Sequence, residues 1–99
     1  MSGGDLITRP ITFAGDQLWL NFATSAAGSV QVELQDQTGK PLPGYAIDDC
    51  EELFGDTLDR SVVWKSKQDL SAIVGQTVRL RFVLRDADVF SFQFREDID

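Results

Sequence analysis

QLWLNFATSAAGSVQVELQD, residues 17–36, alternates apolar with other side chains in two runs. One face of the first run holds Leu18, Leu20 and Phe22. One face of the second run holds Val30, Val32 and Leu34. A period of two is that of a β-strand with one buried face. Between the runs, the small residues Ala26–Ser29 predict a hairpin turn.

The same alternation returns in VRLRFVLRDADVFSFQF, residues 78–94, where Arg85–Asp88 predicts a second tight hairpin. Each predicted strand has one apolar and one mostly polar face, which is typical of an antiparallel sheet solvated on one side. With Pro10 interrupting an N-terminal strand, the pattern predicts an all-β, antiparallel β-sandwich of about seven strands, jelly-roll or immunoglobulin-like. The predicted core is Leu18, Leu20, Phe22, Val30, Val32, Leu34, Val62, Leu80, Phe82, Leu84, Phe90, Phe92 and Phe94.

The length of 99 residues predicts a single domain over 1–99. Residues 1–4 are expected to be a linker or an expression remnant, and residues 96–99 a frayed tail. No signal peptide is visible at the start, Met1-Ser-Gly-Gly, and we expect the chain to be a piece of a larger protein.

The formal net charge of -7 argues against nucleic acid and against an anionic membrane surface as partners. The absence of histidine excludes catalysis by Ser-His-Asp and Cys-His groups and histidine zinc sites. Glycoside hydrolysis needs only two carboxylates. Glycosidase clefts are usually built on larger scaffolds, so we expect no enzymatic activity.

Residues 48–64, DDCEELFGDTLDRSVVW, concentrate acidic side chains in one segment. Calcium prefers oxygen ligands, although the spacing here does not match an EF-hand loop. No cofactor is required, and a structural Ca²⁺ ion has as candidate ligands Asp48, Asp49, Glu51, Asp56 and Asp59. The alternative is a solvated acidic loop paired with Arg60 or Lys65. Neighbouring acids also predict that Cys50 is a packed, inert thiol.

The two tryptophans are expected in different places. Trp19 is out of phase with the core residues of its strand and should face solvent, which suits stacking on a sugar ring. The candidate ligand-binding residues on this outer surface are Trp19, Asn21, Gln31, Glu33, Arg79 and Arg81. Either arginine could stack on the indole. Trp64 is expected in the core near Phe54, with its indole N–H on a buried acceptor.

Four stretches together resemble a known kind of domain: TRPITFAG (8–15), LNFATSAAGSVQVELQDQTGKPLPG (20–44), DDCEELFGD (48–56) and VRLRFVLRDADVFSFQF (78–94). They resemble the C-terminal β-sandwich of large secreted bacterial hydrolases, from planctomycetes and soil bacteria, whose propellers are sialidase-like or of the family 32 glycosidase kind. The resemblance implies an extracellular location and a catalytic domain in cis. Trp19 departs from the pattern, where a smaller or polar side chain is usual.

Two functions remain open from the sequence. The first is a non-catalytic carbohydrate-binding module that binds a plant-type, β-glucan-like polysaccharide through an exposed aromatic platform. The alternative is a bracing β-sandwich that docks on a catalytic domain and has no ligand of its own, in which case Trp19 would anchor the interface.

Overall fold

The computed structural model describes residues 4–65, 70 and 73–95. This part of the chain is all-β and antiparallel, as predicted, and includes a short 3-10 helix. Its elements are β1 (Gly4–Ile7), β2 (Ile11–Thr12), β3 (Gln17–Asp36), η1 (Ile47–Asp49), β4 (Asp56–Ser61) and β5 (Thr77–Arg95). Gly4 therefore belongs to a strand and not to a linker. The rest of the expected linker and the expected tail, 96–99, lie outside the described residues.

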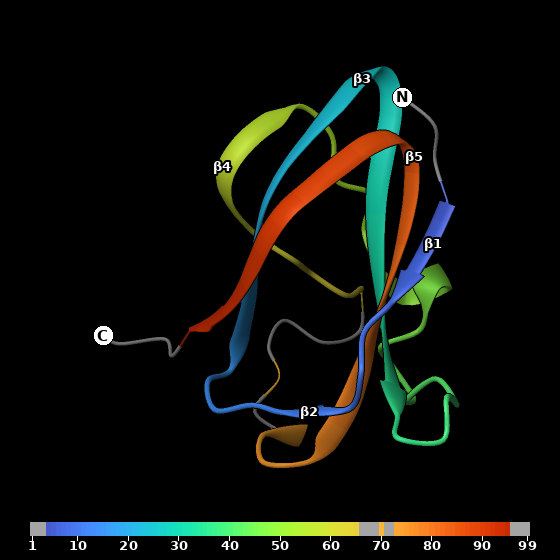
Figure 1. Ribbon diagram of the computed structural model, residues 1–99, viewed down its shortest axis with the longest axis vertical. Helices are drawn as coiled ribbons and strands as arrows, with labels where there is room; N and C mark the ends of the chain where they lie inside the picture. Colours follow the sequence, from blue (N-terminus) through green and yellow to red (C-terminus); the bar gives the residue numbers. More distant parts are fainter. Residues whose placement is uncertain (1–3, 66–69, 71–72, 96–99) are drawn as a thin grey trace.

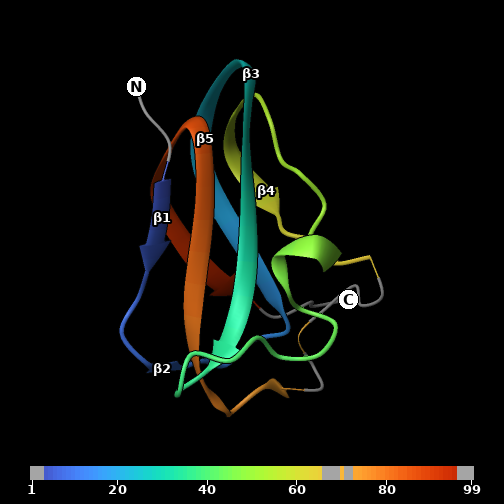
Figure 2. The same cartoon turned by 90° about the vertical axis from the view of Figure 1, so that its right-hand side faces the viewer.

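One sheet contains all five described strands, in the order β1-β5-β3-β4, with β2 also pairing with β5. The two long strands, β3 with 20 residues and β5 with 19, pair with each other over residues 17–24 of β3 and again over residues 29–36, with a register shift between the two stretches. Figure 1 shows that both bend at the same end of the molecule, so the sheet folds over on itself. The short strands add to the edges of this bent ribbon (Figure 2).

The two expected hairpins are wrong. Residues 17–24 pair with 87–95, and residues 29–36 pair with 78–85, so each long strand runs on through a bend. A Cβ on Gly28 would lie 2.5 Å from the carbonyl oxygens of Arg85 and Asp86, and Asp86 has a φ of 45°. The two backbones thus cross closely at the bend. Segments predicted as separate strands are joined, so the described residues form five strands, whereas about seven were predicted for the whole chain.

The core lies between the two halves of the ribbon. Most predicted core residues are confirmed, with exposures of 4% or less. These are Leu18, Leu20, Phe22, Val30, Val32, Leu34, Val62, Leu80 and Phe82. Leu84 and Phe94 are partly buried against the same cluster. Phe90 and Phe92 are 64% and 38% exposed, so their predicted burial is wrong.

A β-bulge explains the error at Phe90. Asn21 pairs with Ser91 but Phe22 pairs with Val89, which leaves Phe90 as an extra residue on β5. A bulge shifts the alternation of side chains by one position. Val89 therefore takes the inward position that the sequence pattern assigned to Phe90. Phe92 lies opposite the buried Leu20, but on a part of β5 whose outer edge no described strand covers.

Candidate functional site

Trp19 lies on the outward face of the first half of β3. Its neighbours Leu18 and Leu20 are buried in the core, and Trp19 itself is half-buried. It pairs across the sheet with Gln93 of β5 on one side and with Ser61 of β4 on the other. The burial of its neighbours confirms the orientation predicted from the strand phase.

Polar side chains hold the indole of Trp19 in place. Its Nε1 donates to Gln17 Oε1 at 2.9 Å, and the Arg95 guanidinium carbon lies 4.7 Å from the ring centroid. Arg95 also donates from Nε and Nη2 to Gln93 Oε1, at 3.1 and 3.0 Å. The indole is therefore a preoriented aromatic surface among amides. We name as the Trp19 face the residues Gln17, Trp19, Asn21, Ser61, Gln93 and Arg95.

The cation on Trp19 is not one of the two arginines that the sequence suggested. Arg79 and Arg81 lie in the half of β5 that pairs with residues 29–36, on the far side of the bend. Arg95 reaches the indole because Gln17 pairs with Arg95 in the continuous ribbon. The predicted hairpins would have paired these segments differently. The sequence pattern therefore could not indicate that Arg95 contacts Trp19, because this contact depends on the bend.

Arg79 and Arg81 contact other parts of the protein. Arg81 forms an ion pair with Asp5 of β1 at 2.5 Å, and its Nη1 lies 3.5 Å from Glu33 Oε2. Arg79 donates from Nε to the carbonyl of Gln37 at 3.1 Å. These contacts tie β1 and the turn after β3 to the sheet. The prediction that the two arginines share a surface with Trp19 is wrong.

Gln31 and Glu33 are covered by the segment around η1. Glu33 is 4% exposed, and its carboxylate accepts from Gln35 Nε2 at 2.7 Å and from the Ile47 N–H at 3.2 Å. Gln31 Nε2 donates to the carbonyls of Ile47 and Cys50, at 3.3 and 3.1 Å. Neither side chain faces solvent freely, contrary to prediction. Of the six predicted ligand residues, only Trp19 and Asn21 lie on the same outward surface, in the first half of β3.

The acidic segment is not one loop. Its start forms η1, Cys50 makes an isolated bridge to Trp64, and β4 begins at Asp56. Asp49 Oδ2 accepts from the Ala46 N–H at 3.4 Å. That hydrogen bond is the capping interaction of a short helical turn.

Calcium binding stays a prediction. Asp48 and Glu51 are exposed, and Asp49 is half-buried. The side chains of Asp56 and Asp59 lie outside the described part of the structure. Among the side chains that are described, no three from His, Cys, Asp and Glu gather closely enough to hold a metal ion.

Cys50 and Trp64 both bind the backbone of Val32. The Val32 N–H donates to Cys50 Sγ at 3.3 Å, and Trp64 Nε1 donates to the Val32 carbonyl at 3.0 Å. Burial raises the pKa of the Cys50 thiol from 9.0 to about 11. Trp64 is 1% exposed, which confirms its predicted place in the core and its buried acceptor. Its aromatic neighbour is Tyr45, at 5.4 Å, whereas Phe54 is 57% exposed.

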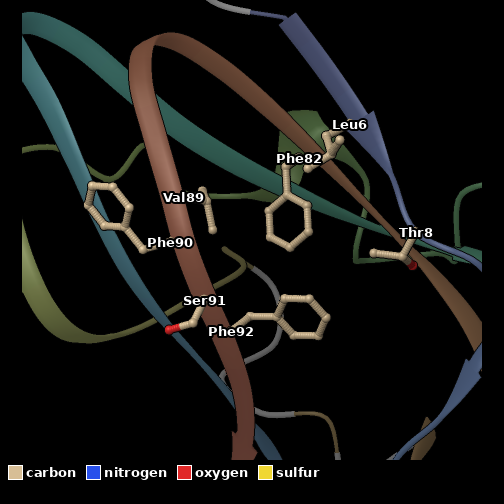
Figure 3. A pocket seen from close by; sticks show the side chains of 7 residues that line it. All are labelled: Leu6, Thr8, Phe82, Val89, Phe90, Ser91 and Phe92. Atoms are coloured by element: carbon tan, nitrogen blue, oxygen red, sulfur yellow. The ribbon is translucent and has the colours of Figure 1, made fainter.

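A concave surface that the sequence did not indicate lies between β1 and the second half of β5. It has a volume of about 380 Å³. We name it the apolar groove, and its lining is Leu6, Thr8, Phe82, Val89, Phe90, Ser91 and Phe92. In Figure 3, Leu6, Phe82 and Phe92 point into one opening, while Phe90 projects on the other side of β5. The β-bulge at Phe90 reverses the direction of that side chain, and the alternation of apolar and polar residues in the sequence does not reveal it.

Comparisons of the chain with protein-family models, with curated proteins and with solved structures found no match. The resemblance to accessory domains of hydrolases therefore stays a prediction, and function is inferred from the geometry. Within residues 4–65, 70 and 73–95, no helix has the length and apolar character of a membrane span.

Proposed function

We propose that this protein is a non-catalytic carbohydrate-binding module of a secreted bacterial glycoside hydrolase. It binds a plant-type, β-glucan-like polysaccharide on the Trp19 face. The observation that carries the proposal is the indole of Trp19, held by Gln17 and Arg95 on an outward sheet surface. An indole offers a flat apolar face for the C–H groups of a sugar ring, and neighbouring amides bind its hydroxyls.

The Trp19 face lies on the bent sheet, which serves as its rigid scaffold. We propose that its two halves form a sandwich of the jelly-roll or immunoglobulin-like kind, which resists deformation when a long polysaccharide is bound. Arg95 covers one side of the indole in the free protein. A sugar ring displaces the guanidinium, which costs about 0.5–1 kcal/mol at an exposed site. The freed guanidinium then donates hydrogen bonds to sugar hydroxyls.

Affinity electrophoresis through gels containing soluble β-glucans tests the proposal. We expect the 99-residue protein to be retarded, and Trp19→Ala to lose at least about tenfold in affinity, or about 1.4 kcal/mol. The matched control is Phe54→Ala, which removes another exposed aromatic ring outside the Trp19 face. Trp19→Ala should keep the melting temperature within a few degrees. Equal retardation of Trp19→Ala and the parent would place the binding site elsewhere.

A specific observation favours a second candidate function, a bracing domain that docks on the catalytic domain in cis. Leu6 and Phe92 both line the apolar groove and are 55% and 38% exposed, and exposed apolar patches mark protein interfaces. A bracing domain would show no retardation by any polysaccharide. That result for the parent protein would make bracing the better account.

A further inference from the structure

We propose that the apolar groove receives an extended segment of a partner protein, which adds as a strand to the outer edge of β5. One apolar side chain of that segment would enter the groove beside Phe82. This binding mode goes beyond carbohydrate recognition and uses a surface separate from the Trp19 face.

The first argument is the strand edge. On this side of β5, β1 pairs with residues 81–84 and β2 with residues 77–78. Across the described residues, no strand pairs with the outer edge of Val89–Gln93, although its inner edge pairs with β3. An open edge presents N–H and C=O groups at the spacing of a β-strand. An extended peptide backbone satisfies that row of groups, as in other cases of strand addition.

The second argument is the groove beside that edge. Phe82 is 1% exposed and lies with its ring centroid 5.6 Å from that of Phe92, which is 38% exposed. Leu6 reaches the same opening from β1 (Figure 3). Alternate side chains of an added strand point to the same face of the sheet. A strand on the β5 edge would thus direct every second side chain over these rings and remove them from water.

The negative charge of the protein favours a partner segment that carries basic residues. The net charge of -7 makes two copies of this chain repel each other. Asp86 and Asp88 are exposed and lie next to the open edge in sequence. We therefore assign the partner segment alternating apolar and basic residues, which places cations near these two acids.

Synthetic peptides test this binding mode. The probe is a fluorescein-labelled peptide of about nine residues in which leucine alternates with lysine and threonine, read by fluorescence anisotropy. Two further peptides carry N-methyl groups on alternate backbone amides, in one phase or in the other. One edge of an added strand faces β5 and the other faces solvent. We expect one phase of methylation to abolish binding and the other to leave the Kd unchanged within about twofold.

A matched pair of variants tests whether the peptide binds in the apolar groove. Leu6 and Ile7 are neighbours on β1 with similar exposures, 55% and 53%, but only Leu6 lines the groove. We expect Leu6→Ser to weaken peptide binding by about tenfold, and Ile7→Ser to leave it unchanged. Because both side chains are exposed, neither change should prevent folding. Amide hydrogen exchange of Val89–Gln93 should slow when the peptide binds.

Three results would overturn the proposal. The first is no binding at about 1 mM peptide. The second is equal tolerance of both methylation phases, which would show apolar adsorption without strand pairing. The third is a dimer in light scattering that Leu6→Ser dissociates, which would make a second copy the occupant. Since Trp19→Ala should not change peptide affinity and Leu6→Ser should not change retardation by β-glucan, failure of either proposal is recognised separately.

Discussion

At the scale of single residues, Val32 shows how the polar groups of the core are satisfied. Its N–H donates to the Cys50 sulfur and its carbonyl accepts from the Trp64 indole. Cys50 and Trp64 also form a β-bridge with each other. Burying these groups without partners would destabilise the fold, because each unpaired buried polar atom costs about 1–3 kcal/mol. The cysteine and the tryptophan of the acidic segment therefore have a structural role.

We predict that Cys50 does not react with maleimide at neutral pH unless the protein is unfolded. The thiol is 2% exposed, and its pKa of about 11 keeps the thiolate scarce. In the folded protein, burial keeps the Cys50 thiol protonated at pH values at which the same thiol ionises in the unfolded chain. The resulting stability is therefore fully present below about pH 9 and is lost as pH rises towards about 11. Urea titrations should show a loss of at most about 3 kcal/mol there. An equal loss in Cys50→Ser would contradict this assignment.

At the scale of elements, the bend of the β3–β5 ribbon depends on Gly28. A side chain there would meet the carbonyl oxygens of Arg85 and Asp86 at 2.5 Å, and neither backbone can move without opening the ladder. We expect Gly28→Ala to lower the free energy of unfolding by about 3 kcal/mol. Ser25→Ala, at an exposed position of the same bend, should change it by less than about 0.5 kcal/mol. Urea denaturation of both variants compares them. Equal stabilities would show that the bend tolerates a side chain.

The bulge at Phe90 is the other element-level feature with a consequence for function. It turns Val89 inward and leaves Phe90 exposed, and it lies on the part of β5 whose outer edge is open. Bulges often occur at sheet edges and next to binding sites, where they redirect side chains. With the bulge, Phe90 points away from the opening that Leu6, Phe82 and Phe92 line.

At the scale of the whole molecule, the acidic surface predicts a response to calcium. If the five predicted ligands bind calcium in the folded state, the melting temperature should rise with calcium concentration, by mass action. These ligands are Asp48, Asp49, Glu51, Asp56 and Asp59. Scanning calorimetry with millimolar calcium and then with chelator measures this shift. Asp48→Asn combined with Glu51→Gln should remove the response. An unchanged melting curve of the parent would identify these acids as a solvated surface.

The alternation of side chains by itself determined that the chain is all-β and antiparallel, and that Leu18, Leu20 and Phe22 are buried while Trp19 is not. Side-chain direction in a strand follows from a period of two, which is local information. It does not reveal where the period is interrupted. The bulge at Phe90 is therefore visible only in the pairing of β5 with β3.

Which strands are neighbours was decided by the tertiary structure alone. Small residues such as Ala26–Ser29 suit a hairpin turn as well as a bend, and only long-range pairing distinguishes the two. Because of this strand pairing, Arg95 lies over Trp19 and Arg81 forms an ion pair with Asp5. The same pairing leaves the outer edge of Val89–Gln93 without a partner strand among the described residues. Binding surfaces combine residues distant in sequence, so their composition depends on strand order and register, which hydrogen bonds between remote segments establish.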